Sequence, residues 1–372
     1  MRGDLKALVA ELERQKNSKA DCVLDTRTVE VAQASPGENN LLVLKPITPQ
    51  AQEWISKAGV PVKMQAFEQI AERSNPAVPI KFAKEMLDRN PLRLVALLNG
   101  LLHDHPEKRM VRMLDGQVRA FLSDKFRLLD NYDIAFTALD AVRQNGGEVI
   151  EASMSDSHMR IKFVNRNVFD AVNVMRAGGP DHAWLGNTGY TKGDDLPGGP
   201  GTVHPIVTIS NSETGHGGYN VQIGLLQAIC VNTAIMEKAV TQVHLGSRLE
   251  VGIYTQETIM QDNKAIFLKA KDAVAAAFKK DVFQRMVNKA KEAQSQTIAN
   301  PTAAVGLVAE NTGLSEDSKN SLLAHFLKDY DQTRYGLAQA IARHAQDVKD
   351  EEKSNELEEI AGKVMTKELA LA

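Results

Sequence analysis

The sequence predicts an α+β protein, with an antiparallel sheet built from hairpins, helices packed on that sheet, and a helical C-terminal third. Two observations support this prediction. Alternating segments follow one another as hairpins, and no regular β-α-β alternation appears, so a doubly wound nucleotide fold is not expected. From about residue 262 to the end, the chain keeps a helical pattern that is rich in Ala, Lys and Gln.

The N-terminal part is expected to combine a helix, two strands and a helical segment. Residues 4–17 carry apolar side chains at helical spacing. The segments DCVLDTRTVEVA and NLLVLKPI are typical of two strands joined by the turn SPGEN. Residues 50–103 look mostly helical, and the stretch PLRLVALLNGLL is apolar on nearly every side, so we expect it to be buried.

Hairpins dominate the middle of the chain. KRMVRML and QVRAFLS flank a turn at Asp115-Gly116, and a helix is predicted from about Asn131 to Gly146-Gly147. Two further hairpins are expected in EVIEASMSDSHMRIKFVN and in residues 207–224. An apolar stripe after residue 224 then predicts a helix, and SRLEVGIYTQETI predicts another strand.

These segments predict three regions, an N-terminal helix at 1–20, an α+β core at 21–261 and a helical region at 262–372. Within the core, residues 178–201 hold eight glycines and three prolines and show no periodicity. We expect a mobile loop there, because glycine keeps the entropy of the chain high. Trp184 in this loop indicates contact with a partner or ligand, or else it anchors the loop.

Composition and charge limit the function classes. The chain has 372 residues, of which 43% are hydrophobic and 24% charged, and its formal net charge is -3, so a nucleic-acid site has to be a local patch. No apolar run approaches the roughly 18 residues of a membrane span. Cys22 and Cys230 have no metal-ligand spacing, and we interpret them as reduced thiols of a cytoplasmic protein.

The loop SETGHGG between the strands of the third hairpin is the first candidate site. Glu213 and His216 would suit an acid/base pair, and the amides of residues 214–218 would suit an anion. The loop leads into a strand and lacks a GK[ST] pattern, so it is not a P-loop, and a plain hairpin tip is the alternative. His204 and His244 match no ligand spacing with His216, so we expect no metal and no cofactor.

One amide interrupts the apolar stripe of the helix that is expected after this hairpin. The stripe includes Leu225, Ile229 and Ile235, and Asn232 lies on it. A buried amide has to be hydrogen-bonded. We therefore predict that Asn232 is buried and bonds to backbone near the hairpin.

The first hairpin carries the strongest candidate for binding nucleic acid, because six cations fall within twenty residues: Lys108, Arg109, Arg112, Arg119, Lys125 and Arg127. Arg112 and residues at even offsets would share one strand face, and such a cationic stripe suits phosphates. A solvated face with local ion pairs is the alternative. The cations of residues 269–291 are expected to form a solvated helix face.

Several motifs resemble a phage and plasmid family of unknown function, the domain of unknown function 932. They are VRAFLSDKFRLLDN, ISNSETGHGG with LLQAICVNTAI, VHLGSRLE, and DQTRYGLAQAIARHAQD with ELEEIAGKVM. The family usually has Cys-Thr-Asn-Gly where this chain has Cys230, Val231, Asn232 and Thr233. The resemblance covers residues from about 20 to 366. It implies a mobile-element protein of a bacterial host that acts in replication, recombination or DNA transfer, and it supplies no catalytic residues.

Three functions are therefore expected in order. The first is a non-catalytic homo-oligomer that binds single-stranded nucleic acid through the first hairpin, in recombination or strand annealing. The second is a metal-dependent nuclease or hydrolase that uses Glu213 and His216. The third is a structural or virion-associated oligomer.

Overall fold

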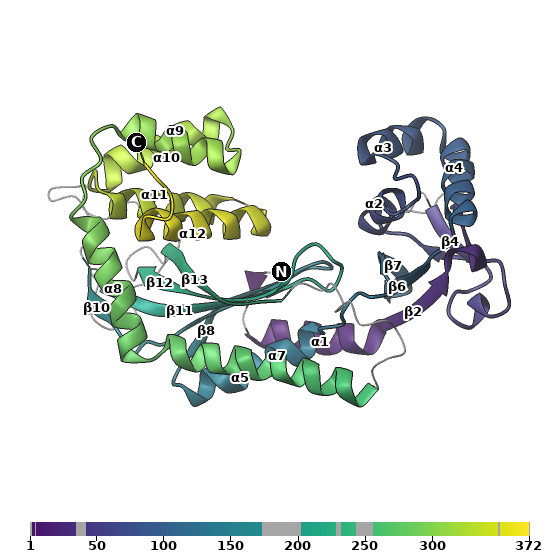
Figure 1. Cartoon of the computed structure of the whole chain (residues 1–372), viewed down its shortest axis with the longest axis horizontal. Helices are drawn as coiled ribbons and strands as arrows, with labels where there is room; N and C mark the ends of the chain where they lie inside the picture. Colours follow the sequence, from purple (N-terminus) through teal and green to yellow (C-terminus); the bar gives the residue numbers. More distant parts are fainter. Residues whose placement is uncertain are drawn as a thin grey trace.

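The computed structural model describes residues 2–3, 5–34, 42–172, 202–227, 232–242, 256–348 and 350–371, and its architecture is α+β with antiparallel sheets, as predicted. A large sheet lies between two groups of helices. A second lobe, built from two small sheets and three helices, stands beyond one end of the large sheet (Figure 1). The helices are concentrated in the C-terminal third, which is also as predicted.

The large sheet has the strand order β1-β8-β9-β11-β12-β13, and β10 pairs with β11. All its pairings are antiparallel. Its strands are β1 (Arg2–Gly3), β8 (Glu148–Met154), β9 (Met159–Val164), β10 (Asp170–Ala171), β11 (Thr202–Asn211), β12 (Tyr219–Gln227) and β13 (Asn232–Gln242).

The two faces of this sheet are covered by different helices (Figure 1). One face packs on α1 (Leu5–Ser18), α5 (Asn131–Gln144) and α7 (Gln256–Ala277). The other face lies under α11 (Arg334–Asp347) and α12 (Glu351–Thr366). Since side chains alternate along a strand, a residue and its neighbour belong to different faces.

The remaining C-terminal helices are α8 (Lys280–Gln294), α9 (Pro301–Thr312) and α10 (Glu316–Asp329). Local sequence explains where α9 begins and ends. The side chain of Asn300 accepts the amide of Ala303 at 3.0 Å, Pro301 occupies the first turn, and Gly313 ends the helix in the left-handed conformation.

The second lobe comprises residues 19–123 and has its own hydrophobic core. Its sheets are β2-β6-β7 and β3-β4-β5. The strands are β2 (Lys19–Asp25), β3 (Val29–Gln33), β4 (Leu42–Pro46), β5 (Val60–Pro61), β6 (Lys108–Leu114) and β7 (Gln117–Ser123), and the helices are α2 (Met64–Glu72), α3 (Ile80–Arg89) and α4 (Pro91–Asp104).

Residues 50–103 are mostly helical, as predicted, in α2, α3 and α4. Three other local predictions differ from the structure. DCVLDTRTVEVA is broken by a 3-10 turn at Thr26–Thr28, so its halves join different sheets. The stretch PLRLVALLNGLL is not buried throughout, since Leu92 of α4 is 68% exposed. Residues 256–259 begin α7, although a strand was predicted to reach them.

The helix predicted after residue 224 is wrong, because the described residues of that segment are strands. Residues 225–227 end β12, and Asn232 begins β13. Residues 221–227 of β12 and 232–236 of β13 are all buried, so in these stretches both faces of the strand are covered and the exposed positions that mark a strand are missing. A short continuous apolar run does not distinguish a buried strand from a buried helix.

Two further points concern the described part of the chain. No helix there combines the length and the apolar character needed to cross a membrane. The expected loop at 178–201 with Trp184, and also Cys230 and His244, lie outside the described residues.

Candidate functional site

The loop SETGHGG is the tip of the hairpin that β11 and β12 form, as predicted. It reaches the second lobe, because Gln69 of α2 donates to the carbonyl of Thr214 at 2.7 Å. Gly215 has a φ of +81°, and a Cβ there would lie 2.8 Å from Leu122 of β7. This glycine is therefore needed for both the turn and the close approach of the two lobes.

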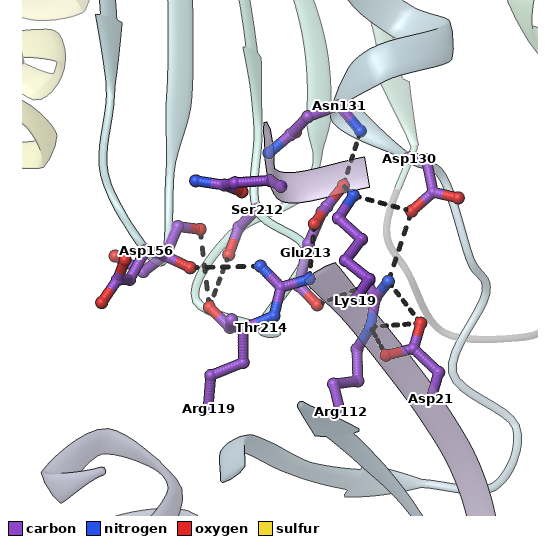
Figure 2. Close-up of polar contacts among 12 residues, drawn as sticks. Lys19, Asp21, Arg112, Arg119, Asp130, Asn131, Asp156, Ser212, Glu213 and Thr214 are labelled. Carbon is purple, nitrogen blue, oxygen red and sulfur yellow. Dashed lines mark hydrogen bonds and ion pairs between the residues drawn. The ribbon is translucent and has the colours of Figure 1, made fainter. Parts of the chain in front are cut away.

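Glu213 is completely buried at this junction, and its carboxylate is fully occupied (Figure 2). One oxygen accepts from Lys19 Nζ at 2.5 Å and from the amide of Asn131 at 2.7 Å. The other accepts from Arg119 Nη2 at 2.6 Å. The three donors come from β2, the start of α5 and β7, so one carboxylate connects three elements.

Arg112 completes the same cluster from β6. Its Nη1 donates to the backbone carbonyl of Glu213 at 2.8 Å, and its Nη2 lies 2.7 Å from Asp21 and 3.3 Å from Asp130 (Figure 2). We call Lys19, Asp21, Arg112, Arg119, Asp130 and Glu213 the Glu213 cluster. It holds three cations against three carboxylates, so its formal charge is balanced.

The electrostatics of the cluster exclude Glu213 as a general base. Burial raises the pKa of Glu213, but the charges of Arg112, Lys19 and Arg119 outweigh that effect and lower the pKa from 4.5 to about 2. A general base that operates near neutral pH needs a much higher pKa and an accessible lone pair. Glu213 has neither, so its role in this chain is to hold the junction.

His216 does not form the expected pair with Glu213, because each has its own partners. The Nδ1 of His216 lies 2.5 Å from Gln65 Nε2, and its carbonyl lies 2.8 Å from His158 Nε2. Burial lowers the pKa of His216. Among the described residues, no group of three or more His, Cys, Asp or Glu side chains is placed to hold a metal ion.

The six cations of the first hairpin do not form one stripe. Arg112 and Arg119 are 0% and 1% exposed and their charges are paired within the Glu213 cluster, so the structure gives no support to their predicted role in binding nucleic acid. Arg109 pairs with Glu107 at 2.6 Å, and Arg127 pairs with Asp262 at 2.5 Å. Lys108 and Lys125 are exposed.

Asn232 is buried and hydrogen-bonded to backbone, as predicted, but its partner is not the hairpin. The side chain is fully buried; its Nδ2 donates to the carbonyl of Gln339 at 3.1 Å, and its Oδ1 accepts from Gln346 at 2.7 Å. Both partners belong to α11, so this amide ties the start of β13 to α11 and not to the hairpin.

The exposed cations of the described chain are most concentrated on α7 and α8. Residues 264–291 contain seven lysines and Arg285 against Asp272 and Asp281, which gives a net charge of +6. Within this segment, Lys271 contacts Asp140 and Lys291 contacts Asp170, both at 3.2 Å. Five lysines are exposed and form no ion pair with any described residue: Lys264, Lys269, Lys279, Lys280 and Lys289.

The sequence carried this signal, since the run of cations at 269–291 was visible. From the sequence alone such a run predicts a solvated helix face, because helices often expose lysines. What the structure adds is the contrast with the first hairpin, where neighbouring carboxylates neutralise most of the charge. On α7 and α8 most of the charge is left without such partners.

Comparison with known proteins identified no relative of this chain. No protein-family model, no curated protein and no solved structure matches it. The resemblance to the phage and plasmid family therefore gains no support from these comparisons, and it stays a prediction.

Proposed function

We propose that this protein binds single-stranded nucleic acid without catalysing a reaction on it, and that the exposed cations of α7 and α8 form the binding surface. The observation that carries the proposal is the net charge of +6 over residues 264–291, in a chain whose total is -3. Phosphate backbones bind such a local patch through release of condensed counterions.

Exposed apolar side chains beside a cation on α7 support single strands as the ligand. Met260 and Leu268 of α7 are 69% and 52% exposed, and at spacings of four residues they share a helix face with Lys264. Unpaired bases offer faces that pack against exposed side chains next to cations, whereas the bases of a duplex are stacked inside it. A homo-oligomer, as expected for a strand-annealing protein, is also part of the proposal.

The enzymatic alternative has less support. Its two residues, Glu213 and His216, are each held by other groups, and the Glu213 carboxylate is buried and ionised. The proposal also includes a role in recombination or strand annealing, for a phage or plasmid protein in the cytoplasm of a bacterial host. This part rests only on the resemblance to the phage and plasmid family.

The test is a titration of a fluorescent oligo-dT of about 30 nucleotides, followed by anisotropy at several salt concentrations. Each phosphate contact on a single strand should contribute a slope of roughly -0.7 in the logarithmic plot. With about five contacts, affinity should fall roughly a hundredfold between about 50 and 200 mM salt.

A charge-matched pair of variants locates the surface. Changing Lys264, Lys269, Lys279, Lys280 and Lys289 to Gln should flatten the slope by about three. A control with the same charge change replaces five exposed lysines elsewhere: Lys6, Lys57, Lys81, Lys328 and Lys363. Equal losses in both variants, or no retention of oligo-dT by the folded wild type, would contradict the proposal, and tighter binding of a duplex would correct the ligand.

A further inference from the structure

The large sheet has one face of unusual chemistry, and it is the face under α12. Two successive rows of cross-strand neighbours on that face are entirely polar. They run from β9 to β13 as Lys162, Thr208, Gln222 and Lys238, and as Arg160, Ser210, Asn220 and Thr241. The intervening positions on the opposite face, such as Ile161, Ile209 and Val221, are buried and apolar.

Two adjacent glutamates of α12, Glu358 and Glu359, form ion pairs with the cations of these rows. The carboxylate of Glu358 bridges Arg160 at 2.5 Å and Lys162 at 2.7 Å. Glu359 contacts Lys238 at 2.9 Å and accepts from Gln222 at 2.6 Å. Lys162 also contacts Glu151 of β8 at 3.0 Å, so the rows are not held by α12 alone.

The sheet face offers more hydrogen-bonding capacity than α12 uses. Thr208 Oγ1, Gln222 Oε1 and Arg160 Nε are buried and have no hydrogen-bond partner within the described part of the chain. Buried polar groups are nearly always paired, so groups that are left over need an explanation. A ligand with several acceptor and donor atoms would supply the missing bonds.

The two ends of α12 are attached in different ways. Toward its C-terminus, Ala361, Val364 and Met365 are buried in the main core, and a Cβ on Gly362 would lie 1.6 Å from the carbonyl of Ile235. That end is packed backbone to backbone on β13.

Toward its N-terminus the main core holds one apolar side chain, Leu357, and the other attachments are polar, such as the hydroxyl of Ser354, which donates to the carbonyl of Ala345 at 2.8 Å. The segment 350–359 contains six carboxylates and one lysine, a net charge of -5. It is the part of α12 that a polyanion would compete with most directly.

We propose that the polar rows of the large sheet are a second binding surface for nucleic-acid phosphates, and that the acidic segment 350–359 of α12 occupies this surface in their place. A bound strand would displace the segment and pair with Arg160, Lys162 and Lys238, while the end of α12 from Ala361 onward stays packed. This inference rests on the proposed function, because it assigns the same class of ligand.

The experiment compares two charge-matched variants in the oligo-dT titration. Glu358→Gln with Glu359→Gln removes the two carboxylates from the rows and keeps their size. Affinity should rise about tenfold and the salt slope should steepen by about two, as three freed cations contribute roughly -0.7 each. Glu352→Gln with Glu356→Gln is the control, since these carboxylates are exposed on the same segment, and its effect should stay within about twofold.

Hydrogen exchange of the wild type tests the same inference without a variant, and so still applies if Glu358→Gln with Glu359→Gln does not fold. Oligo-dT should speed exchange at the amides of 352–359 and leave those of 361–366 unchanged. Equal affinity gains in both variants, or unchanged or greater protection of 352–359 at saturating oligo-dT, would overturn the inference. The lysine variants of α7 and α8 test the proposed function alone. If they show no effect, the affinity of the glutamate variants and the hydrogen exchange of α12 still test the inference.

Discussion

Glu213→Gln removes one charge from the Glu213 cluster while keeping the size of the side chain. Lys19, Arg112 and Arg119 would then face only Asp21 and Asp130. Arg119 is 1% exposed, and its ion pair with Glu213 at 2.6 Å would be lost. A buried cation without its partner is strongly unfavourable, so we expect the variant to fold with reduced stability.

Two routes give the magnitude. Removing one partner of a buried ion pair costs about 3–5 kcal/mol in the free energy of unfolding. The lowered pKa of Glu213, from 4.5 to about 2, corresponds to about 3 kcal/mol of stabilisation at neutral pH. The two values agree, and we expect a loss of about 3 kcal/mol at pH 7.

The pH dependence follows from the direction of the shift. The folded pKa of Glu213 lies below its unfolded value, so the unfolded state binds the proton first as pH falls. The stabilisation is fully present above about pH 4.5 and is lost as the pH falls toward 2. The difference between wild type and Glu213→Gln should therefore shrink across that window.

Urea denaturation at pH 7, 4 and 3 measures this difference. Asp156→Asn is the control, because Asp156 pairs with Lys63 at the surface and is 52% exposed. Surface pairs contribute about 0–1 kcal/mol, so the control should lose no more than that. A loss below about 1 kcal/mol for Glu213→Gln, or a difference that does not change with pH, would refute the structural role of the cluster.

Three other predictions test the packing. In a denaturant titration, Gly362→Ala should lose at least about 2 kcal/mol in the free energy of unfolding or fail to fold, because its Cβ would overlap the carbonyl of Ile235. The matched variant Gly306→Ala in α9 should gain up to about 1 kcal/mol, because a Cβ there meets no atom within 4 Å. Asn232→Ala should cost about 1–3 kcal/mol by thermal unfolding, because buried groups of α11 lose their partner, and an unchanged midpoint would contradict this. Burial raises the pKa of the Cys22 thiol to about 12, so a thiol reagent at pH 8 should modify it only after unfolding, and fast labelling of that residue in the native protein would show otherwise.

Local patterns predicted much of the fold. The alternation at 108–123, 148–165 and 207–224 gave three hairpins in the right places, because each has a turn sequence between two strand-like runs. The helix that begins at Asn131 was also correct. The misassigned segment after residue 224 failed because a strand that is buried on both faces loses its alternation.

The candidate site was predicted less well, for a physical reason. Glu213 finds its partners 94 and 194 residues away in the chain, at Arg119 and Lys19. No local spacing encodes such distances. A strand pattern tells which residues share a face, but it does not tell whether another lobe covers that face, and Arg112 is covered.

Charge balance separates the cations that serve the fold from those that are left for a ligand. In the Glu213 cluster three cations meet three carboxylates and the arginines are buried, so that charge is used within the chain. Residues 264–291, which run from α7 into α8, carry a net charge of +6 and five exposed lysines that form no ion pair with a described residue, while segment 350–359 carries -5 and sits on a sheet face with three cations. A polyanion could bind the cations of α7 and α8 directly. It could bind the cations of the sheet face only by replacing the acidic segment. Binding should therefore begin at α7 and α8, and the sheet face should engage afterwards, which would appear as a slower second phase in stopped-flow anisotropy that is absent in Glu358→Gln with Glu359→Gln.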